Sequence, residues 1–283
     1  MRLRCKRLAG SVICILMSYW SDKVAVVTGG SRGLGRAVTS AFASAGARVV
    51  IAARDPDVLA RCASDLRAGG ADVTTVVTDV TQAAQVDNMV RQAVDRYGRL
   101  DVLVNNAGRS TRGDIAATTA EAFEELMRVN FLATVRCTRA ALPHLLSSRG
   151  HLVNIGSIAA KIAAPHLGAY PATKFAVAGY SQQLRLELGP QGLHVLLVCP
   201  GPILRTDGGS RYDHVATGLP DAARQPGGTS QLKPIPAARV ADKVLRYCER
   251  RKPELVMPGK VRLLLAVAQL FPSLADKVIR RKP

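Results

Sequence analysis

The glycine-rich turn at residues 29–35 constrains the fold more than any other feature of the sequence. It follows a short valine-rich run, residues 23–28, which has the composition of a buried parallel strand. A helical pattern then continues to Ala45. In the order strand, turn and helix, glycines let the backbone approach a phosphate, and the helix N-terminus points free N–H groups at it. The turn therefore predicts a nucleotide-binding α/β fold.

The residues around the turn distinguish between kinds of nucleotide. A mononucleotide P-loop needs Lys and then Ser or Thr after its last glycine, but Arg36 and Ala37 stand there, so a dinucleotide is favoured. At the end of the second strand of such a site, an acid would bind the 2′-hydroxyl of NAD, whereas an arginine accommodates the 2′-phosphate of NADP. The second strand, residues 48–54, ends in Arg54, and Arg32 in the turn is a second candidate. The sequence predicts NADP.

Strands and helices alternate along the chain at the spacing of a parallel sheet with crossover helices. The 283 residues are 48% hydrophobic and 21% charged, which suffices for one large core. We expect an α/β fold: a Rossmann-type doubly wound parallel sheet flanked by helices, in a single domain over residues 22–258. The expected strands are residues 23–28, 48–54, 72–78, 101–104, 151–156, 193–199 and 254–258, and helices are expected up to Ala45, over 56–68, 82–97, around Asn130, and over 170–188 and 237–251.

Tyr170 and Lys174 are the pair best suited to proton transfer. They are four residues apart, and Pro171 is tolerated in a helix only in its first turn, so the pair is expected where a helix begins. A free phenol has a pKa near ~10. A lysine ammonium about 4 Å away would stabilise the phenolate by roughly 4 kcal/mol at an effective dielectric of ~20, or about three pK units. The pair predicts a general acid/base that works near neutral pH.

Six short motifs follow one another along residues 22–258. They are Thr-Gly-x-x-x-Gly-x-Gly at 28–35, Asp-Val at 79–80, Asn-Asn-Ala-Gly at 105–108, Asn130, Ser157 with the Tyr-x-x-x-Lys pair, and Pro-Gly at 200–201. Together they resemble the short-chain dehydrogenase/reductase family. The resemblance implies that Tyr170 is the general acid/base and that Lys174 lowers its pKa and holds the nicotinamide ribose. It also implies that Ser157 hydrogen-bonds the carbonyl oxygen and that Asn130 supports a proton-relaying water.

The same resemblance implies where the cofactor lies. Asp79 and Val80 would meet the adenine, residues 106–108 the middle of the cofactor, and Ile203 the carboxamide. The implied cofactor-binding residues are Gly29, Ser31, Arg32, Gly33, Leu34, Gly35, Arg54, Asp79, Val80, Asn106, Ala107, Gly108, Tyr170, Lys174, Pro200, Gly201 and Ile203.

Four polar residues near these motifs are left out of the predicted site. Family members commonly carry a threonine five positions after the proline of Pro-Gly, but Arg205 stands there and Thr206 follows. Asn105 is expected to make a structural hydrogen bond to a neighbouring strand. His166, four residues before Tyr170, either lines the pocket or is incidental.

Composition excludes several other functions. The net charge of +18 invites a nucleic-acid partner, but the aromatic content is 4% and no binding module is recognisable, so none is predicted. Six dispersed cysteines without Cys-x-x-Cys, and dispersed histidines, indicate neither disulfides nor a metal site, and a reducing, cytoplasmic compartment fits best. From Lys233 onward there are thirteen lysines and arginines against four acidic residues. Such a tail favours an anionic membrane surface or acidic ligands.

Two further segments lie outside the regular alternation. Residues 1–21 are expected to be a lead-in, because basic residues before an apolar run at 8–20 resemble the start of a signal peptide, yet no cleavage site follows and the run is too short to span a bilayer. Translation from Met17 is the alternative. Residues 204–236 are rich in glycine and proline, and such long loops usually contact substrate.

Residues 259–283 form a basic, apolar extension. Its charged ends and the central Pro272 predict two short amphipathic helices. Residues 259–282 either lie on a membrane surface or pack on the domain or complete a dimer. The membrane interpretation would favour a lipophilic substrate.

The predicted function is an NADP(H)-dependent oxidoreductase that interconverts a carbonyl and a secondary alcohol, mainly as a reductase of a lipophilic small molecule. A 3-oxoacyl reductase of lipid synthesis is the alternative within the same fold. A non-catalytic NADP-binding sensor or scaffold is the alternative from another class, and the presence of Ser157, Tyr170 and Lys174 argues against it. The resemblance also implies a homo-oligomer.

Overall fold

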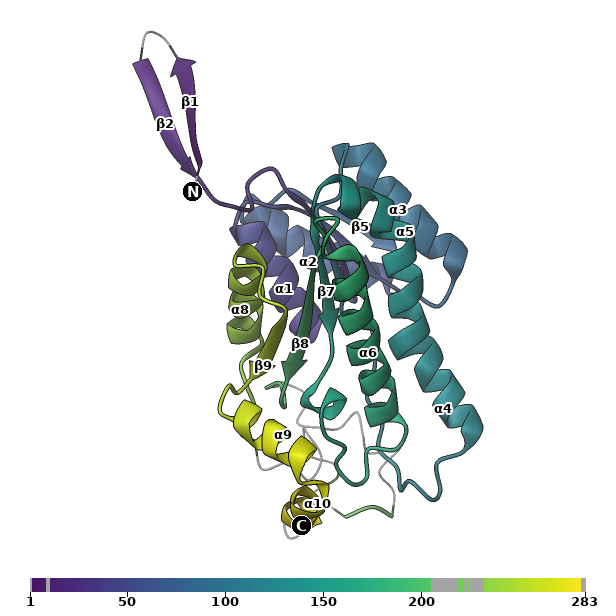
Figure 1. Cartoon of the computed structure of the whole chain (residues 1–283). Helices are drawn as coiled ribbons and strands as arrows, with labels where there is room; N and C mark the ends of the chain where they lie inside the picture. Colours follow the sequence, from purple (N-terminus) through teal and green to yellow (C-terminus); the bar gives the residue numbers. More distant parts are fainter. Residues whose placement is uncertain (1, 9–10, 205–217, 221–222, 224–231, 281–283) are drawn as a thin grey trace.

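Seven parallel strands make up the central sheet of the protein (Figure 1). The computed structural model describes residues 2–8, 11–204, 218–220, 223 and 232–280. Within these residues the strand order is β5-β4-β3-β6-β7-β8-β9, and every neighbouring pair is parallel. The order turns back between β3 and β6, the switch point of a doubly wound sheet, which confirms the predicted fold class. The strands are β3 (Val24–Thr28), β4 (Arg48–Ala53), β5 (Val73–Val77), β6 (Val102–Asn105), β7 (His151–Ile155), β8 (His194–Pro200) and β9 (Glu254–Met257).

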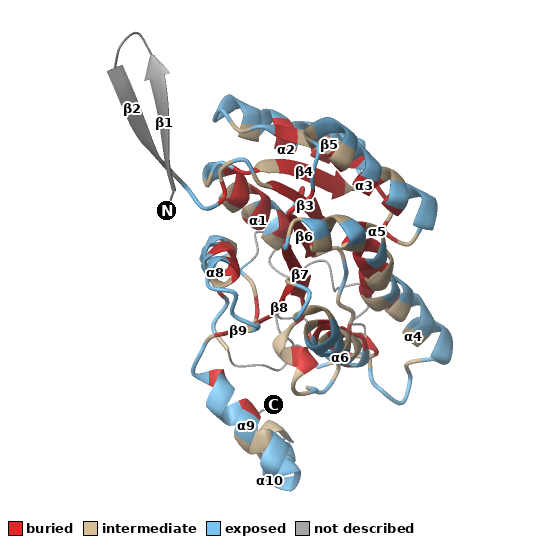
Figure 2. Ribbon diagram, turned by 45° about the horizontal axis from the view of Figure 1, so that its top comes forward, coloured by how far each residue is buried: buried red, intermediate tan, exposed pale blue. Residues whose placement is uncertain are grey.

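Helices cover both faces of the sheet (Figure 2). They are α1 (Gly33–Ser44), α2 (Pro56–Ala68), α3 (Ala83–Tyr97), α4 (Ala120–Met127), α5 (Ala133–Ser147), α6 (Tyr170–Leu188) and α8 (Ala237–Glu249). Because successive strand residues point to opposite faces, Val24 and Val26 enter one core while Ala25 and Val27 enter another. α1, α2 and α8 bury the Val27 side, and α3, α5 and α6 bury the Val26 side.

The N-terminal residues form a separate antiparallel hairpin of β1 (Arg2–Leu8) and β2 (Ser11–Met17). Tyr19 and Trp20, which follow the hairpin, pack on the domain. Trp20 is 1% exposed, its ring meets Phe42 edge-on with centroids 4.8 Å apart, and its Nε1 donates to Glu249 Oε1 at 2.7 Å.

Among the described helices, none is both long and apolar enough to span a membrane.

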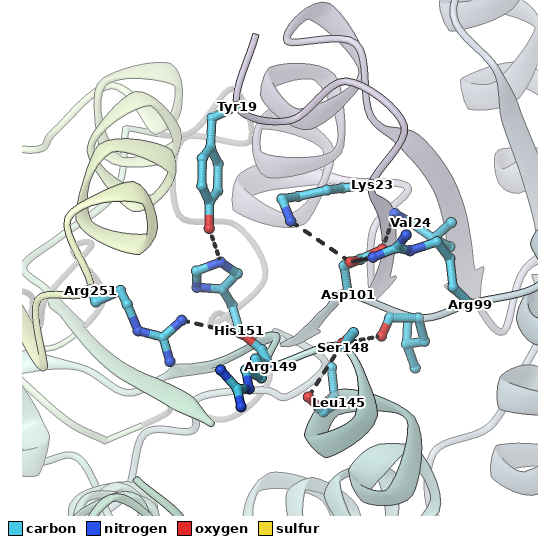
Figure 3. Close-up of polar contacts among 11 residues, drawn as sticks. Tyr19, Lys23, Val24, Arg99, Asp101, Leu145, Ser148, Arg149, His151 and Arg251 are labelled. Atoms are coloured by element: carbon cyan, nitrogen blue, oxygen red, sulfur yellow. Dashed lines mark hydrogen bonds and ion pairs between the residues drawn. The ribbon is translucent and has the colours of Figure 1, made fainter. Parts of the chain in front are cut away.

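One buried carboxylate joins the starts of the central strands (Figure 3). Asp101 Oδ2 accepts hydrogen bonds from Val24 N at 3.0 Å and from Arg99 Nε at 2.8 Å. Lys23 Nζ lies 3.7 Å from Asp101 Oδ1. A buried charge is tolerated when it is paired and hydrogen-bonded in this way. These contacts therefore hold together the amino ends of the central strands, which lie opposite the expected ligand-binding end of the sheet.

The structure also brings together two histidines that are far apart in the sequence. His151 Nδ1 and His194 Nδ1 are 2.9 Å apart, and Cys248 Sγ lies within 4.8 Å of this pair. His194 Nε2 bonds the Lys252 carbonyl at 2.9 Å. His151 Nε2 bonds the Tyr19 hydroxyl at 2.8 Å (Figure 3). Since a carbonyl only accepts, His194 Nδ1 must accept from His151 Nδ1–H, and Tyr19 must donate. One set of tautomers satisfies every ring nitrogen, so the cluster is explained without a metal ion. Burial lowers the pKa of His151 to about 3 and that of His194 to about 4, so both are neutral.

Beyond β9 the predicted pair of short helices is present as α9 (Val261–Leu270) and α10 (Pro272–Arg280). Most of the predicted substrate loop, with Arg205 and Thr206, lies outside the described residues.

We predict that Trp20→Ala lowers the free energy of unfolding by roughly 3–5 kcal/mol, because it removes a fully buried aromatic side chain. Glu249→Gln, which alters only the polar partner of the indole, should cost about 1 kcal/mol. Urea unfolding of both variants measures these values. Equal, small effects would show that residues 18–21 contribute little to the domain.

Candidate active site

The glycine-rich turn is folded so tightly that side chains are excluded from it. Gly29 and Gly33 have φ values of +61° and +53°, which favour glycine. A Cβ on Gly35 would lie 2.1 Å from the Gly29 carbonyl oxygen, so no other residue fits there without opening the turn. No side chain caps the N-terminus of α1, whose first turn follows. Its N–H groups therefore suit the pyrophosphate of a dinucleotide.

A clamp between Thr28 and Asn106 joins the turn to the next strand at the switch point. The Thr28 hydroxyl donates to Val104 O and accepts from Asn106 N and Ala107 N, at 3.0–3.1 Å. The Asn106 side-chain amide donates to Thr28 O at 2.9 Å and to Gly29 O at 3.1 Å. The Asn106 side chain thus holds the turn in place, and the predicted contact of residues 106–108 with the cofactor stays a prediction.

The side chain of the preceding residue is structural, as predicted. Asn105 Nδ2 donates to Asn154 Oδ1 on β7 at 2.9 Å and to Thr138 Oγ1 on α5 at 3.0 Å. Both partners are buried.

The adenosine end of the predicted site is rich in arginine. Arg54 is exposed at the end of β4. Arg32 Nη2 donates to Asp55 Oδ2 at 3.0 Å, and the pair is largely exposed. Partial burial would raise the pKa of Asp79, but hydrogen bonds from Thr81 and the positive charges of Arg54 and Arg128 lower it below its usual value.

Arg128 was not predicted from the sequence. It begins a π-helical turn between α4 and α5, Arg128–Leu132, and its charge reaches Asp79 across the switch point. No local motif marks it, because only the fold brings the two residues close.

Asn130 lies in the same π-helical turn and ties three segments together. Its Nδ2 donates to Arg109 O at 2.8 Å and to Thr173 Oγ1 on α6 at 3.0 Å, while its Oδ1 accepts from Arg109 N at 2.9 Å. π-helical turns are frequent at functional sites. The side chain of Asn130 therefore positions α6 against the loop after β6.

Lys174 is buried on the first turns of α6, at 6% exposure. Its Nζ donates to Ile155 O at the end of β7 at 2.8 Å. Burial lowers the pKa of Lys174 to about 8. The Nζ lies over the Tyr170 ring, 5.8 Å from its centroid. Tyr170 begins α6 and Pro171 follows in its first turn, so the pair lies where a helix begins, as predicted.

Ser157 lies where β7 ends. Its Oγ accepts from Ala159 N at 3.1 Å and so caps the short 3-10 helix η2 (Ile158–Ala160). α6 packs against η2, which places this serine beside the helix of Tyr170 and Lys174. Cys199, which the sequence did not place at the site, is buried near Ser157 and Lys174. Burial raises its pKa to about 12, so the thiol is neutral and inert.

The remaining predicted residues continue from β8. Gly201 N donates to Met257 O at 2.7 Å, and a Cβ on Gly201 would lie 3.3 Å from both Met257 O and Ile158 Cδ1. Ile203 pairs with Ile235 in an isolated bridge and packs on the core. His166, left open by the sequence, adopts a left-handed φ of +60° and its carbonyl accepts from Gly113 N at 3.2 Å.

Comparison with known proteins finds related sequences. The family model described as short chain dehydrogenase matches residues 23–214. A putative ketoacyl reductase of the granaticin polyketide synthase of Streptomyces violaceoruber is 39% identical over 63% of this chain, and the match spans 66% of that protein, just under two thirds. L-fucose dehydrogenase of Mus musculus is 36% identical over 79% of this chain and 83% of its own.

A solved structure is also similar over nearly the whole fold. A short-chain dehydrogenase/reductase from Burkholderia phymatum in complex with NAD has a TM-score of 0.78 and 26% identity, and the match covers 91% of this chain and 96% of that one. Since the family model matches residues 23–214, more than half of the sequence, this chain belongs to the short-chain dehydrogenase/reductase family.

Proposed function

We propose that the protein is an NADP(H)-dependent oxidoreductase that interconverts a carbonyl and a secondary alcohol, mainly as a reductase of a lipophilic small molecule. The observation that carries the proposal is the buried Lys174, held by Ile155 O over the ring of Tyr170. Perturbed, buried ionisable groups beside a nucleotide cradle favour an active site over a binding scaffold.

The residues of the site divide the work of reduction. A bound nicotinamide dinucleotide supplies the hydride. Ser157 Oγ hydrogen-bonds the substrate carbonyl, which orients and polarises it. The Tyr170 hydroxyl gives its proton to the carbonyl oxygen, so the alcohol forms and a phenolate remains. A protonated Lys174 about 6 Å from the ring stabilises that phenolate by roughly 3 kcal/mol at an effective dielectric of ~20. Asn130 keeps α6 in register with the loop after β6.

The arginines support NADP over NAD. Arg54 stands at the end of β4, where a dinucleotide site reads the adenosine ribose. Asp55, the nearest acid, accepts from Val58 N at 3.1 Å as the N-cap of α2 and pairs with Arg32. Its carboxylate is thus engaged by the protein rather than offered to a ribose hydroxyl. The Burkholderia phymatum relative was solved with NAD, so the preference has to be measured.

A second candidate is reduction of a 3-oxoacyl chain, which the similarity to the granaticin ketoacyl reductase favours. We further propose that the protein acts in the cytoplasm, in part at membrane surfaces, and assembles into homo-oligomers as its family members often do. The four cysteines with described side chains, Cys62, Cys137, Cys199 and Cys248, are buried free thiols, which suits a reducing compartment.

Cofactor preference is tested by titration with NADPH and NADH. Wild type should bind NADPH more tightly, and Arg54→Ala together with Arg32→Ala should weaken NADPH by about tenfold or more, because a charge-assisted bond to phosphate is worth roughly 1.5–3 kcal/mol. NADH affinity should change little. Arg61→Ala, which removes an exposed charge from α2, is the matched control. Equal binding of both cofactors by wild type would contradict the NADP assignment.

Catalysis is tested with Tyr170→Phe and a panel of lipophilic aldehydes and ketones. Loss of the general acid should lower kcat about 10²–10⁴-fold while NADPH binding persists. Tyr180→Phe removes a hydroxyl from the same helix outside the site and should retain activity. Comparable activity of the two variants would show that Tyr170 transfers no proton.

The low pKa of Lys174 predicts a pH dependence of stability. The pKa is about 8 in the folded protein against 10.5 for a free lysine. Between these values the unfolded chain binds more protons, so this group makes folding more favourable as pH rises. Relative to Lys174→Met, wild type should gain up to roughly 3 kcal/mol of unfolding free energy from below pH 8 to above pH 10. Urea unfolding at each pH measures this difference. If the unfolding free energies of wild type and Lys174→Met differ by the same amount at every pH, the pKa shift of Lys174 is excluded.

A further inference from the structure

The C-terminal extension is attached to the domain by one side of α9. Val261 and Leu265 are buried in a core cluster with Leu197, Val256 and Cys199. These partners come from β8 and β9, so α9 rests at the carboxyl end of the sheet, below the ends of β8 and β9 in Figure 1. Catalytic residues lie at this same end. The extension is therefore fixed next to the active site.

The opposite side of the extension is apolar and exposed. Leu263, Val267 and Leu270 are spaced four and three residues apart, so they share a side of α9 that points away from the buried pair. We use the term apolar face for the exposed large side chains of residues 263–274: Leu263 (75% exposed) and Leu270 (73%) on α9, Leu264 (53%) on its flank, Phe271 (59%) between the helices and Leu274 (54%) on α10.

This concentration distinguishes the extension from the rest of the surface. Among the described residues, twelve large hydrophobic side chains are exposed, and five of them lie in the twelve residues 263–274. Single exposed leucines are ordinary on proteins, whereas a contiguous apolar patch marks an interaction surface. Figure 2 shows most of α9 in the colour of exposed residues, with a few buried positions.

Basic residues flank the apolar face. Lys260 and Arg262 precede it and Lys277 follows it, and all three are exposed. In the sequence, residues 259–283 carry six lysines and arginines against Asp276. A second copy of the chain would bring the same positive charges together across a two-fold interface, which is unfavourable. Anionic lipid headgroups would neutralise them and also accept the apolar side chains.

We propose that the apolar face docks on an anionic lipid bilayer, with α9 and α10 lying in the interface. Helices of ten and nine residues are too short to span the hydrocarbon core, which needs about 20 residues. Docking there turns the carboxyl end of the sheet towards the membrane. For the substrate class the inference rests on the proposed function: a carbonyl compound dissolved in the bilayer reaches Tyr170 from the lipid phase.

Flotation with vesicles tests the docking on the full chain. The probes are vesicles of phosphatidylcholine alone and of equal parts phosphatidylcholine and phosphatidylserine. Wild type should bind the acidic vesicles at least about tenfold more tightly than the neutral ones, and high salt should weaken the binding. NADPH titration of the same samples reports separately on the fold and on the proposed function.

Two sets of variants separate the apolar and electrostatic contributions. Leu263→Gln with Leu270→Gln and Phe271→Gln removes much of the apolar face, and Lys260→Gln with Arg262→Gln and Lys277→Gln removes three charges. Each set should reduce binding to acidic vesicles at least about tenfold, because both contributions are needed for stable attachment. Leu186→Gln, at a side chain 67% exposed on α6, is the control and should bind like wild type.

Three outcomes would overturn the proposal. The first is no binding to acidic vesicles by wild type that binds NADPH. The second is vesicle binding that survives the apolar variants, which would place the contact elsewhere on the chain. The third is a dimer in sedimentation equilibrium that the apolar variants convert to monomer without any effect on vesicles, which would make a second copy the occupant. If wild type binds vesicles but does not bind NADPH, the proposed function is contradicted while the docking proposal stands.

Discussion

The candidate site depends on one costly interaction, the burial of the Lys174 amine between α6 and the end of β7. Taking an ammonium out of water is unfavourable, as the lowered pKa of this group shows. The Ile155 carbonyl gives it a partner and fixes its position over the Tyr170 ring. This position places the amine beside a phenol, as the proposed acid/base chemistry requires. The cost to stability is thus the physical counterpart of the proposed acid/base chemistry.

Hydrogen bonds between distant segments hold this arrangement. At the switch point, the Thr28 hydroxyl and the Asn106 amide bind the glycine turn to the end of β6. Asn130, in its π-helical turn, ties the loop after β6 to Thr173 on α6, one residue before Lys174. The cradle for a dinucleotide and the proton-transfer pair are therefore parts of one hydrogen-bonded edge. At the other end of the sheet, Asp101 and the neutral His151–His194 pair fix the strand starts.

Local patterns were sufficient to predict the sheet, the order of its elements, the split of the extension at Pro272 and the pairing of Tyr170 with Lys174. Each of these leaves a periodic or adjacent signal in the sequence. Features that depend on contacts between distant residues leave no such signal in the sequence. They are Arg128 beside Asp79, Cys199 beside Ser157, and the pair of histidines that begin two strands. Asn106 stays a predicted cofactor-binding residue, but its motif did not predict that its side-chain amide bonds Thr28 O, because that contact depends on the fold. The exposed apolar face on α9 also required the structure, since only burial shows which leucines remain outside.

The central claim is that Lys174 and Tyr170 form one coupled acid/base unit. It is tested most directly by ultraviolet titration of phenolate formation in wild type, Tyr170→Phe and Lys174→Met. The account predicts one tyrosine in wild type that ionises well below the ordinary value of ~10, absent from Tyr170→Phe and returned to higher pH in Lys174→Met. Three titrations without any tyrosine ionising below about pH 9 would contradict it, because the ammonium would then exert no useful influence on the phenol.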